Sequence, residues 1–367
     1  MTARFPVSAL HWTVLVPVVS VVVLALTWGR ALPVAVVVVV ACFLCAAVLA
    51  AVRHAEVVAH RVGQLFGALV LAVAVTVIEV ALILTLTADG GPQSAGLARD
   101  TVFAAVMITC NGITGLSLLV GALRRRVAVF NPEGTGASLA TVATIATLSL
   151  VLPTFTTSAP GPRFNTAQLS FAAAASLILY GLFVATQTVR HRAHFLPVSA
   201  GGEVIDGFEA EEVERPTARA ALSSVVLLLV ALVGVVGLAK VESPTIERGV
   251  QQAGLPSSVV GVVIALLVLL PETLAAVRAA ARDRVQTSLN LALGSAMASI
   301  GLTIPAVAIA SVWTGPLLLG LNATHMVLLT ITVAVGTLTM MRGRATPLHA
   351  GVHLALLAAY LVLAVSP

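Results

Sequence analysis

Charged residues are scarce in this sequence. Only 10% of its 367 residues are Asp, Glu, Lys or Arg, whereas a soluble globular domain carries about 25%. Apolar residues make up 59% of the chain, and leaving apolar surface in water costs about 25 cal/mol per Å². The composition therefore excludes a soluble globular protein and indicates a chain that is embedded in a lipid bilayer.

Aromatic residues and cysteines are also few. Phe, Trp and Tyr account for 4% of the chain, too few for a surface that stacks nucleic-acid bases, and no nucleic-acid partner is expected. Three cysteines give no disulfide framework. Cys42 and Cys45 lie in an apolar run, where we interpret them as small packed or lipid-facing residues rather than as a redox pair. No Walker A or GxSxG motif occurs, so neither an ATPase nor a serine hydrolase is predicted.

Long apolar runs recur along the chain. A helix needs about 20 apolar residues to cross a bilayer, and the runs predict an all-α integral membrane protein of about eleven transmembrane helices. The first run lacks a clear cleavage site, which predicts a retained leading helix. The expected helices lie near residues 10–28, 31–52, 62–87, 100–123, 137–157, 168–189, 219–239, 257–278, 286–311, 317–341 and 347–365.

The basic residues test this helix count independently. With the N-terminus inside and one crossing per helix, 15 of the 20 Lys and Arg residues fall in inside segments and 5 in outside segments. Cytoplasmic loops of membrane proteins carry an excess of Lys and Arg. An error in the helix count would distribute these residues over both sides of the membrane. We therefore expect a multi-pass protein of a bacterial inner membrane, with a cytoplasmic N-terminus and an extracytoplasmic C-terminus.

The chain contains a weak internal repeat. The apolar run that contains Glu79 aligns with the run that contains Glu272, at an offset of 193 residues. Five helices are an odd number, so the second copy must enter the membrane inverted, as in secondary transporters. The predicted organisation is a leading helix (1–30), a first five-helix repeat (31–189), an acidic cytoplasmic linker (190–218) and a second five-helix repeat (219–367).

The linker has two interpretations. It connects the halves as a solvated segment, or it attracts cations and regulates transport. Its acidic residues are Glu203, Asp206, Glu209, Glu211, Glu212 and Glu214.

Glu79 and Glu272 carry the predicted chemistry. Each lies deep in an apolar run, where a carboxylate costs at least about 2.5–3.5 kcal/mol and persists when it has a partner or a function. If both face one cavity, their charge of −2 matches a divalent cation held by oxygen ligands. Protons and metal would then compete for the same oxygens, which is proton-coupled antiport in its simplest form.

Neutral groups near these helices suit such a site. Pro271 leaves the carbonyl of Leu267 without its helical donor, and such a carbonyl is tolerated where it lines a site. Polar side chains that could add oxygens, or pack neighbouring helices, are Thr76, Asn111, Ser295 and Ser299.

His54, Glu56 and His60 precede the third helix on the cytoplasmic side. Their spacing is not HExxH, so no zinc protease is predicted. They form either a proton access point or a solvated helix face.

Several segments resemble one family. They are Val73-Ala-Val-Thr-Val-Ile-Glu-Val80, Ala98-Arg-Asp-Thr-Val-Phe-Ala-Ala-Val-Met107, Asn111-Gly112, Leu289-Asn-Leu-Ala-Leu-Gly-Ser-Ala296 and Ser299-Ile-Gly-Leu-Thr-Ile-Pro305. From about Arg53 to the C-terminus, the chain resembles the bacterial calcium/proton antiporters, in the ChaA-type branch of the calcium/cation antiporter superfamily.

The resemblance implies one leading helix, two inverted five-helix repeats, and an acidic residue in the third and eighth helices that binds cation and proton. It assigns those roles to Glu79 and Glu272, with support from Asn111 and Ser295. Many members have GNxxE at the acidic residue, whereas this chain has Val75-Thr76 and Val268-Leu269. Fewer side-chain oxygens would surround the metal, which bears on calcium selectivity.

The expected function is secondary active transport, with Ca²⁺ leaving the cell in exchange for H⁺. The first alternative is a Na⁺ or K⁺/proton antiporter on the same site, and a cation channel is a weaker one. We expect no bond-making enzyme and no cofactor besides the transported ions. The expected partners are an inorganic cation and the lipid bilayer, and the sequence leaves the oligomeric state open.

Overall fold

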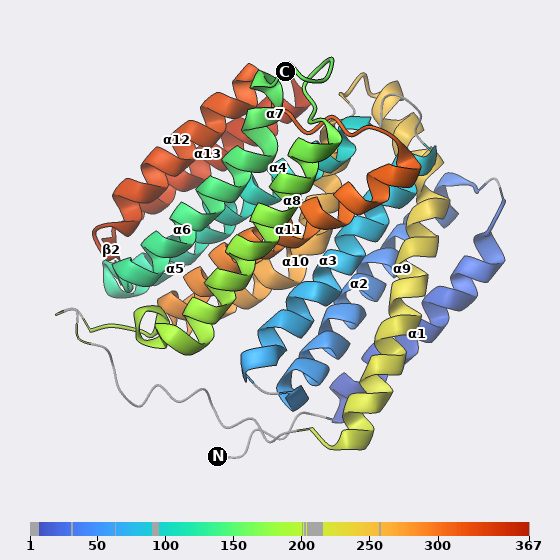
Figure 1. The fold of residues 1–367 in the computed structure, drawn as a ribbon. Coiled ribbons are helices and arrows are strands. Elements are labelled where there is room, and N and C mark those ends of the chain that lie inside the picture. The colour runs from blue at the N-terminus through green and yellow to red at the C-terminus, as the bar shows by residue number, and fades with distance from the viewer. Residues whose placement is uncertain are drawn as a thin grey trace. The chain divides into compact units, whose positions relative to one another are not determined.

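The computed structural model describes residues 7–30, 32–62, 64–89, 95–199, 201, 203, 216–256 and 258–366. These residues form eleven helical segments, some of them interrupted by a π-helical turn, and one short two-stranded sheet (Figure 1). The predicted all-α membrane fold is confirmed. The chain divides into two compact units, one of residues 1–90 and 212–253 and one of residues 91–211 and 254–367.

The length and composition of the helices suit a bilayer. Nine helices in the described part of the chain are long and apolar enough to cross a membrane, and two shorter apolar helices span Trp12–Thr27 and Val73–Thr85. Large apolar side chains such as Leu15, Phe171 and Trp313 are 59%, 64% and 79% exposed. Exposed apolar surface on this scale fits contact with lipid.

The first unit contains four helices. They are α1 (Val7–Thr27), α2 (Val34–Val62), α3 (Gln64–Asp89) and α9 (Ala218–Gln252). The helix α2 packs along both α9 and α3, while α1 packs on α9 and α2. Small residues permit these contacts, since Ala47, Ala50 and Ala51 of α2 are fully buried.

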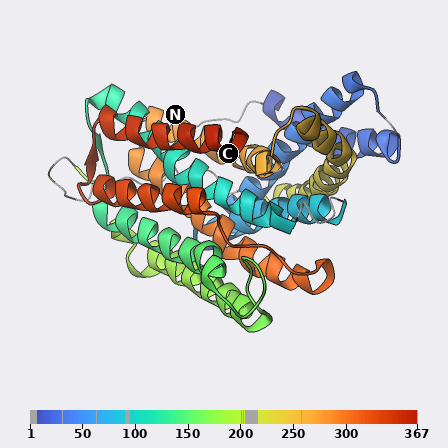
Figure 2. The ribbon, with the colours of Figure 1, turned by 90° about the horizontal axis from the view of Figure 1, so that it is seen from above.

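The second unit contains the remaining elements (Figure 2). A continuous helical segment consists of α4 (Leu97–Met107), a π-helical turn (Ile108–Ile113) and α5 (Thr114–Arg125). The other elements are α6 (Pro132–Ala146), a π-helical turn (Thr147–Val151), α7 (Leu152–Phe155), α8 (Thr166–Ala185) with a π-helical turn (Thr186–Arg190), a 3-10 turn (Arg192–Phe195), α10 (Ser258–Ala281), α11 (Val285–Thr314), α12 (Ala323–Met340) and α13 (Pro347–Val365).

Packing in the second unit is reciprocal between the two halves of the chain. The third helix of the first half ends in α5 and packs on α13, the fifth helix of the second half. Conversely, α11 is the third helix of the second half and packs on α8, the fifth of the first. This exchange of contacts fits the predicted pair of inverted five-helix repeats, and the division of the chain into those repeats stays a prediction.

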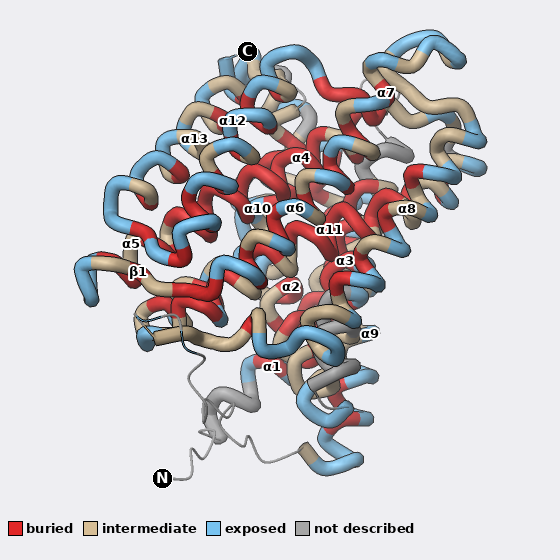
Figure 3. The backbone as a smooth tube through the Cα atoms, turned by 60° about the vertical axis from the view of Figure 1, so that its left-hand side comes forward, coloured by how far each residue is buried: buried red, intermediate tan, exposed pale blue. Residues whose placement is uncertain are grey.

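A short sheet joins two loops of this unit. The strands β1 (Ala128–Val129) and β2 (Arg344–Ala345) pair antiparallel, with Ala128 opposite Ala345. Phe130, Leu139 and Leu289 form a buried apolar cluster beside the sheet. The segment α4–α5 is the most buried of the spanning helices and is drawn largely in red in Figure 3.

Four predicted helix boundaries were wrong by five residues or more, and one of them is the start of α6, which lies at Pro132 rather than near 137. The helix α2 continues past residue 52 to Val62, and α9 continues past 239 to Gln252, because charged residues do not by themselves break a helix. The helix α12 begins at Ala323 rather than near 317. Pro316 follows Gly315, whose φ is +92°, and Asn322 caps α12 by accepting a hydrogen bond from the His325 amide at 2.8 Å.

Candidate functional site

Glu79 is buried in the first unit. It lies in α3 and is 2% exposed, and Ile78, Leu82 and Ile83 on the same helix are also buried. Thr76 lies one turn earlier on the same helix and is also buried. Three residues advance a helix by most of a turn, so the Thr76 hydroxyl and the Glu79 carboxylate share one side of α3.

Glu272 lies in the second unit, on α10, and is half-buried. The helix continues through Pro271. The nitrogen of Pro271 carries no hydrogen, so it donates no helical hydrogen bond. Thr273 donates its hydroxyl to the carbonyl of Leu269 at 2.7 Å. The two glutamates that the sequence predicted to share a site therefore lie one in each compact unit, and each is described in its own surroundings.

Asn111 is fully buried in the π-helical turn of the second unit. Its Nδ2 donates to Thr332 Oγ1 of α12 at 2.9 Å, and its Oδ1 accepts from His353 Nδ1 of α13 at 3.2 Å. Thr339 Oγ1 lies 3.3 Å from His353 Nε2. Both ends of the Asn111 amide therefore bind neighbouring helices, which is the packing role that the sequence left open beside the ligand role.

The two serines lie on α11. Ser299 is 6% exposed and Ser295 is half-buried one turn earlier. Ala292 and Ala296 are fully buried on the same helix, which allows close approach of its neighbours. The ligand role of both serines remains a prediction.

The structure separates His54 from Glu56 and His60, the three residues that the sequence predicted to lie together on the cytoplasmic side. His54 is buried, and its Nε2 lies 2.9 Å from the carbonyl of Thr13, so it joins α2 to α1. Glu56 pairs with Arg53 at 2.6 Å on a partly exposed part of α2. His60 is exposed. Of the three, Glu56 and His60 retain the access to solvent that a proton access point would need.

Most of the acidic linker lies outside the described residues, namely Asp206, Glu209, Glu211, Glu212 and Glu214. Glu203 is exposed. The residues before it dock on the second unit, because Asn290 of α11 donates to the carbonyl of Phe195 at 2.8 Å.

Sequence reasoning missed two buried acids and two buried histidines. Glu242 lies beyond the predicted helix 219–239, yet it is 3% exposed within α9, which continues to Gln252. Asp100 is 6% exposed at the start of α4. His325 and His353 had no assigned role, and both are buried. The sequence shows that such residues lie near the ends of predicted helices. It does not show that they are buried, because burial depends on partners that are distant in the sequence.

The described residues contain no group of three or more His, Cys, Asp or Glu side chains able to hold a metal ion.

We expect Asn111→Leu to destabilise the protein. The change removes both hydrogen bonds and leaves the Thr332 hydroxyl and the His353 ring buried without these partners, at a cost of about 1–3 kcal/mol per group. The measurement is the thermal unfolding midpoint of the purified protein in detergent. The control is Thr141→Ala, whose exposed hydroxyl donates to the carbonyl of Ala137 on its own helix at 2.9 Å. A loss of cation affinity at unchanged stability would instead assign Asn111 to the cation site.

Comparison with known proteins gives consistent matches. The family model described as "Sodium/calcium exchanger protein" matches residues 32–189 and 223–366. The Sinorhizobium fredii protein y4hA, which is named as an ionic transporter, is 43% identical over 100% of both chains. The sodium-potassium/proton antiporter ChaA of Escherichia coli is 32% identical over 94% of both chains.

Solved structures share the fold. The structure of native YfkE has a TM-score of 0.71 at 16% identity and covers 98% of this chain and 99% of its own. The H⁺/Ca²⁺ exchanger CAX has a TM-score of 0.70 at 15% identity and covers 98% of this chain and 89% of its own. At such low identity these likenesses establish the fold alone.

Proposed function

This chain belongs to the sodium/calcium exchanger family, and from that premise we propose that it is a proton-coupled cation antiporter that exports Ca²⁺. The relatives are transporters, which fits an activity that makes and breaks no covalent bond. The proposed setting is a bacterial inner membrane with the N-terminus inside.

The observation that carries the proposal is the burial of Glu79. A carboxylate that is 2% exposed within an apolar helix costs at least about 2.5–3.5 kcal/mol in a membrane. That cost is offset when the charged form binds a cation and the neutral form binds a proton. Glu272 follows a proline in another apolar helix and is proposed to act in the same way.

Exchange follows from competition for these oxygens. When protons occupy the carboxylates, the metal loses its charged ligands, and when the metal binds, the protons must leave. If the occupied carboxylates open to one side of the membrane at a time, cation efflux is tied to proton influx.

Transport of Na⁺ or K⁺ is the second candidate. It is favoured by the 32% identity to an antiporter named for sodium, potassium and protons. Val75-Thr76 and Val268-Leu269 also stand where many family members have Gly-Asn. Fewer neutral oxygens suit a cation with a lower charge and a weaker demand for ligands.

The test is proton movement in everted membrane vesicles that contain the protein, followed with a pH-sensitive dye. Ca²⁺, Na⁺ and K⁺ are added separately to vesicles that hold a proton gradient. We expect Ca²⁺ to collapse the gradient, whereas vesicles without the protein should not respond. A response to Na⁺ or K⁺ alone would move the assignment to the second candidate. Cation flux with no proton movement would indicate a channel and refute antiport.

A further inference from the structure

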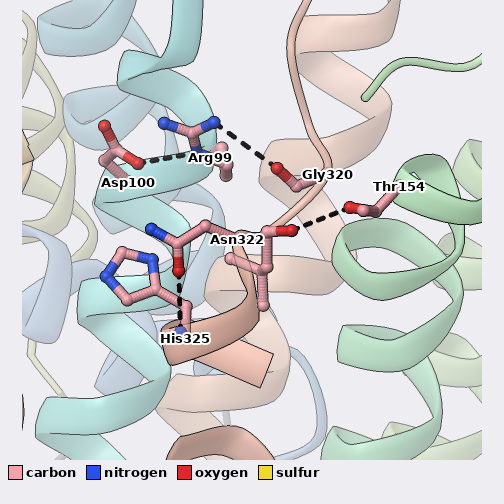
Figure 4. Close-up of polar contacts among 7 residues, drawn as sticks. Arg99, Asp100, Thr154, Gly320, Asn322 and His325 are labelled. Carbon is pink, nitrogen blue, oxygen red and sulfur yellow. Dashed lines mark hydrogen bonds and ion pairs between the residues drawn. The ribbon is translucent and has the colours of Figure 1, made fainter. Parts of the chain in front are cut away.

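The first turns of α4 and α12 place titratable side chains together in the second unit (Figure 4). Asp100 lies at the start of α4 and is 6% exposed, while His325 lies at the start of α12 and is 8% exposed. Arg99 Nε donates to Asp100 Oδ1 at 2.7 Å. None of these residues belongs to the pair of glutamates on which the antiport proposal rests.

The His325 ring is held in place by its surroundings. It stacks on Phe103 with the ring centroids 4.6 Å apart, and the Tyr360 ring of α13 stands edge-on at 6.1 Å. Its Nδ1 has no hydrogen-bond partner among the described residues. The buried hydroxyl of Thr101, next to Asp100, likewise has none within that part of the chain. Burying these two polar groups without hydrogen-bond partners costs free energy. Within a membrane, buried polar groups of this kind often mark a pathway for ions or protons.

A non-helical segment fixes the distance between α4 and α12. Residues 315–322 form a segment without helix or strand between α11 and α12, and Thr154 donates to the carbonyl of Leu321 at 2.8 Å. Arg99 also reaches the carbonyl of Gly320, at 3.4 Å. Backbone without helical bonds is tolerated at membrane depth only where protein buries it or where it lines a water-filled space. The contacts thus hold His325 beside the Arg99–Asp100 pair.

The charge of the cluster favours a proton over a metal ion. Arg99 and Asp100 are paired and neutralise each other, so the cluster offers no net negative charge to a cation. The groups that face His325 are Asp100 and Arg99 from α4 and Tyr360 from α13. The imidazole is the member that can gain and lose a proton at ordinary pH.

The helix α10 links this cluster to Glu272. Gly261 packs directly on Asp100, since a Cβ at Gly261 would lie 2.9 Å from the Asp100 carbonyl carbon and 3.0 Å from its Cβ. Glu272 follows eleven residues later, which is a rotation of about 20° and a rise of about 16 Å. Asp100 therefore packs on the face of α10 that carries the Glu272 carboxylate, about three turns away.

We propose that His325 and Asp100 form a proton-transfer site that supplies Glu272 from the membrane face where α4 and α12 begin. Under the predicted orientation this is the extracytoplasmic face. A hydronium ion in the aqueous phase gives up a proton, so that one of its O–H bonds breaks as the N–H bond forms at His325 Nδ1, and the nearby Asp100 carboxylate, which stays paired with Arg99, lowers the electrostatic cost of the imidazolium. That N–H bond then breaks as the proton passes through water toward Glu272, which leaves the ring neutral for the next cycle. The inference rests on the proposed proton coupling and adds a carrier outside the cation site.

The test separates proton transfer from cation transfer. Purified wild type, His325→Gln and Asp100→Asn are placed in liposomes, with Asp283→Asn as the matched control. Asp283 pairs with Arg125 at 3.1 Å in an exposed loop. Two rates are measured over a range of pH: radioactive Ca²⁺ uptake driven by a proton gradient, and exchange of radioactive for unlabelled Ca²⁺, which needs no net proton movement. If the wild type carries Na⁺, that ion replaces Ca²⁺ in both assays.

We expect His325→Gln and Asp100→Asn to slow proton-driven uptake about tenfold or more and to change its pH profile. Cation self-exchange should stay within about twofold of wild type, because the cation site is untouched. The control should match wild type in both assays. Equal loss of both rates in the two variants would show a structural role and overturn the proposal, as would unchanged proton-driven uptake. A wild type without proton-driven uptake would instead refute the antiport function itself.

Discussion

Glu79→Gln and Glu272→Gln are each expected to abolish cation-driven proton movement in everted vesicles. Glutamine keeps the shape of a protonated glutamate but can neither ionise nor release a proton. If metal and protons share the carboxylates, loss of either one removes charge from the metal site and a proton from the cycle. We expect a loss of about a hundredfold or more, as for groups that carry protons directly.

The same variants should fold at least as well as the wild type. A neutral amide costs less to bury than a carboxylate, so the unfolding midpoint in detergent should be unchanged or higher. Glu133→Gln is the matched control, since Glu133 is exposed and pairs with His194 at 3.0 Å on the surface. Normal proton movement in either buried variant would make that glutamate structural and would end the two-carboxylate mechanism.

Hydropathy was enough to predict the helices because the bilayer imposes a simple rule on length. Each spanning run must be about 20 residues long and largely uncharged, so the runs and the basic loops between them define the fold. The failures occurred where this rule does not apply. Arg53, Glu56 and Arg61 lie within α2, and Lys240 and Glu242 lie within α9. A helix accepts charged residues where they can reach water, so hydropathy does not define its ends.

The candidate site was predictable only in part, for a related reason. A lone carboxylate in an apolar run is visible in the sequence, and Glu79 is indeed buried. The partners of Asn111 are 221 and 242 residues away, on α12 and α13. Arg99 and Gly320 are likewise 221 residues apart. No local pattern encodes such pairs, so the role of Asn111 in packing and the proximity of Asp100 and His325 emerged only from tertiary structure.

A glycine pair offers the strongest test of the second unit. Gly261→Ala is expected to destabilise the protein, whereas Gly181→Ala is expected to stabilise it. A Cβ at Gly261 would lie 2.9 Å from both the Asp100 carbonyl carbon and the Thr101 amide nitrogen, and these are backbone atoms that cannot rotate away. At Gly181, on the exposed side of α8, nothing lies within 4 Å. Thermal unfolding of both variants in detergent is the measurement.

The two substitutions are expected to change the free energy of unfolding in opposite directions, because helix propensity and steric overlap contribute differently at the two positions. Alanine gains helix propensity of about 1 kcal/mol over glycine on either helix, and only Gly261 adds an overlap that costs about 1–3 kcal/mol or more. Gly261→Leu should enlarge the loss and also slow cation exchange, because it pushes α10, and with it Glu272, away from α4. A Gly261→Ala protein as stable as Gly181→Ala would mean that α10 and α4 are not in this close contact. The link from Asp100 along α10 to Glu272 would then lose its structural basis.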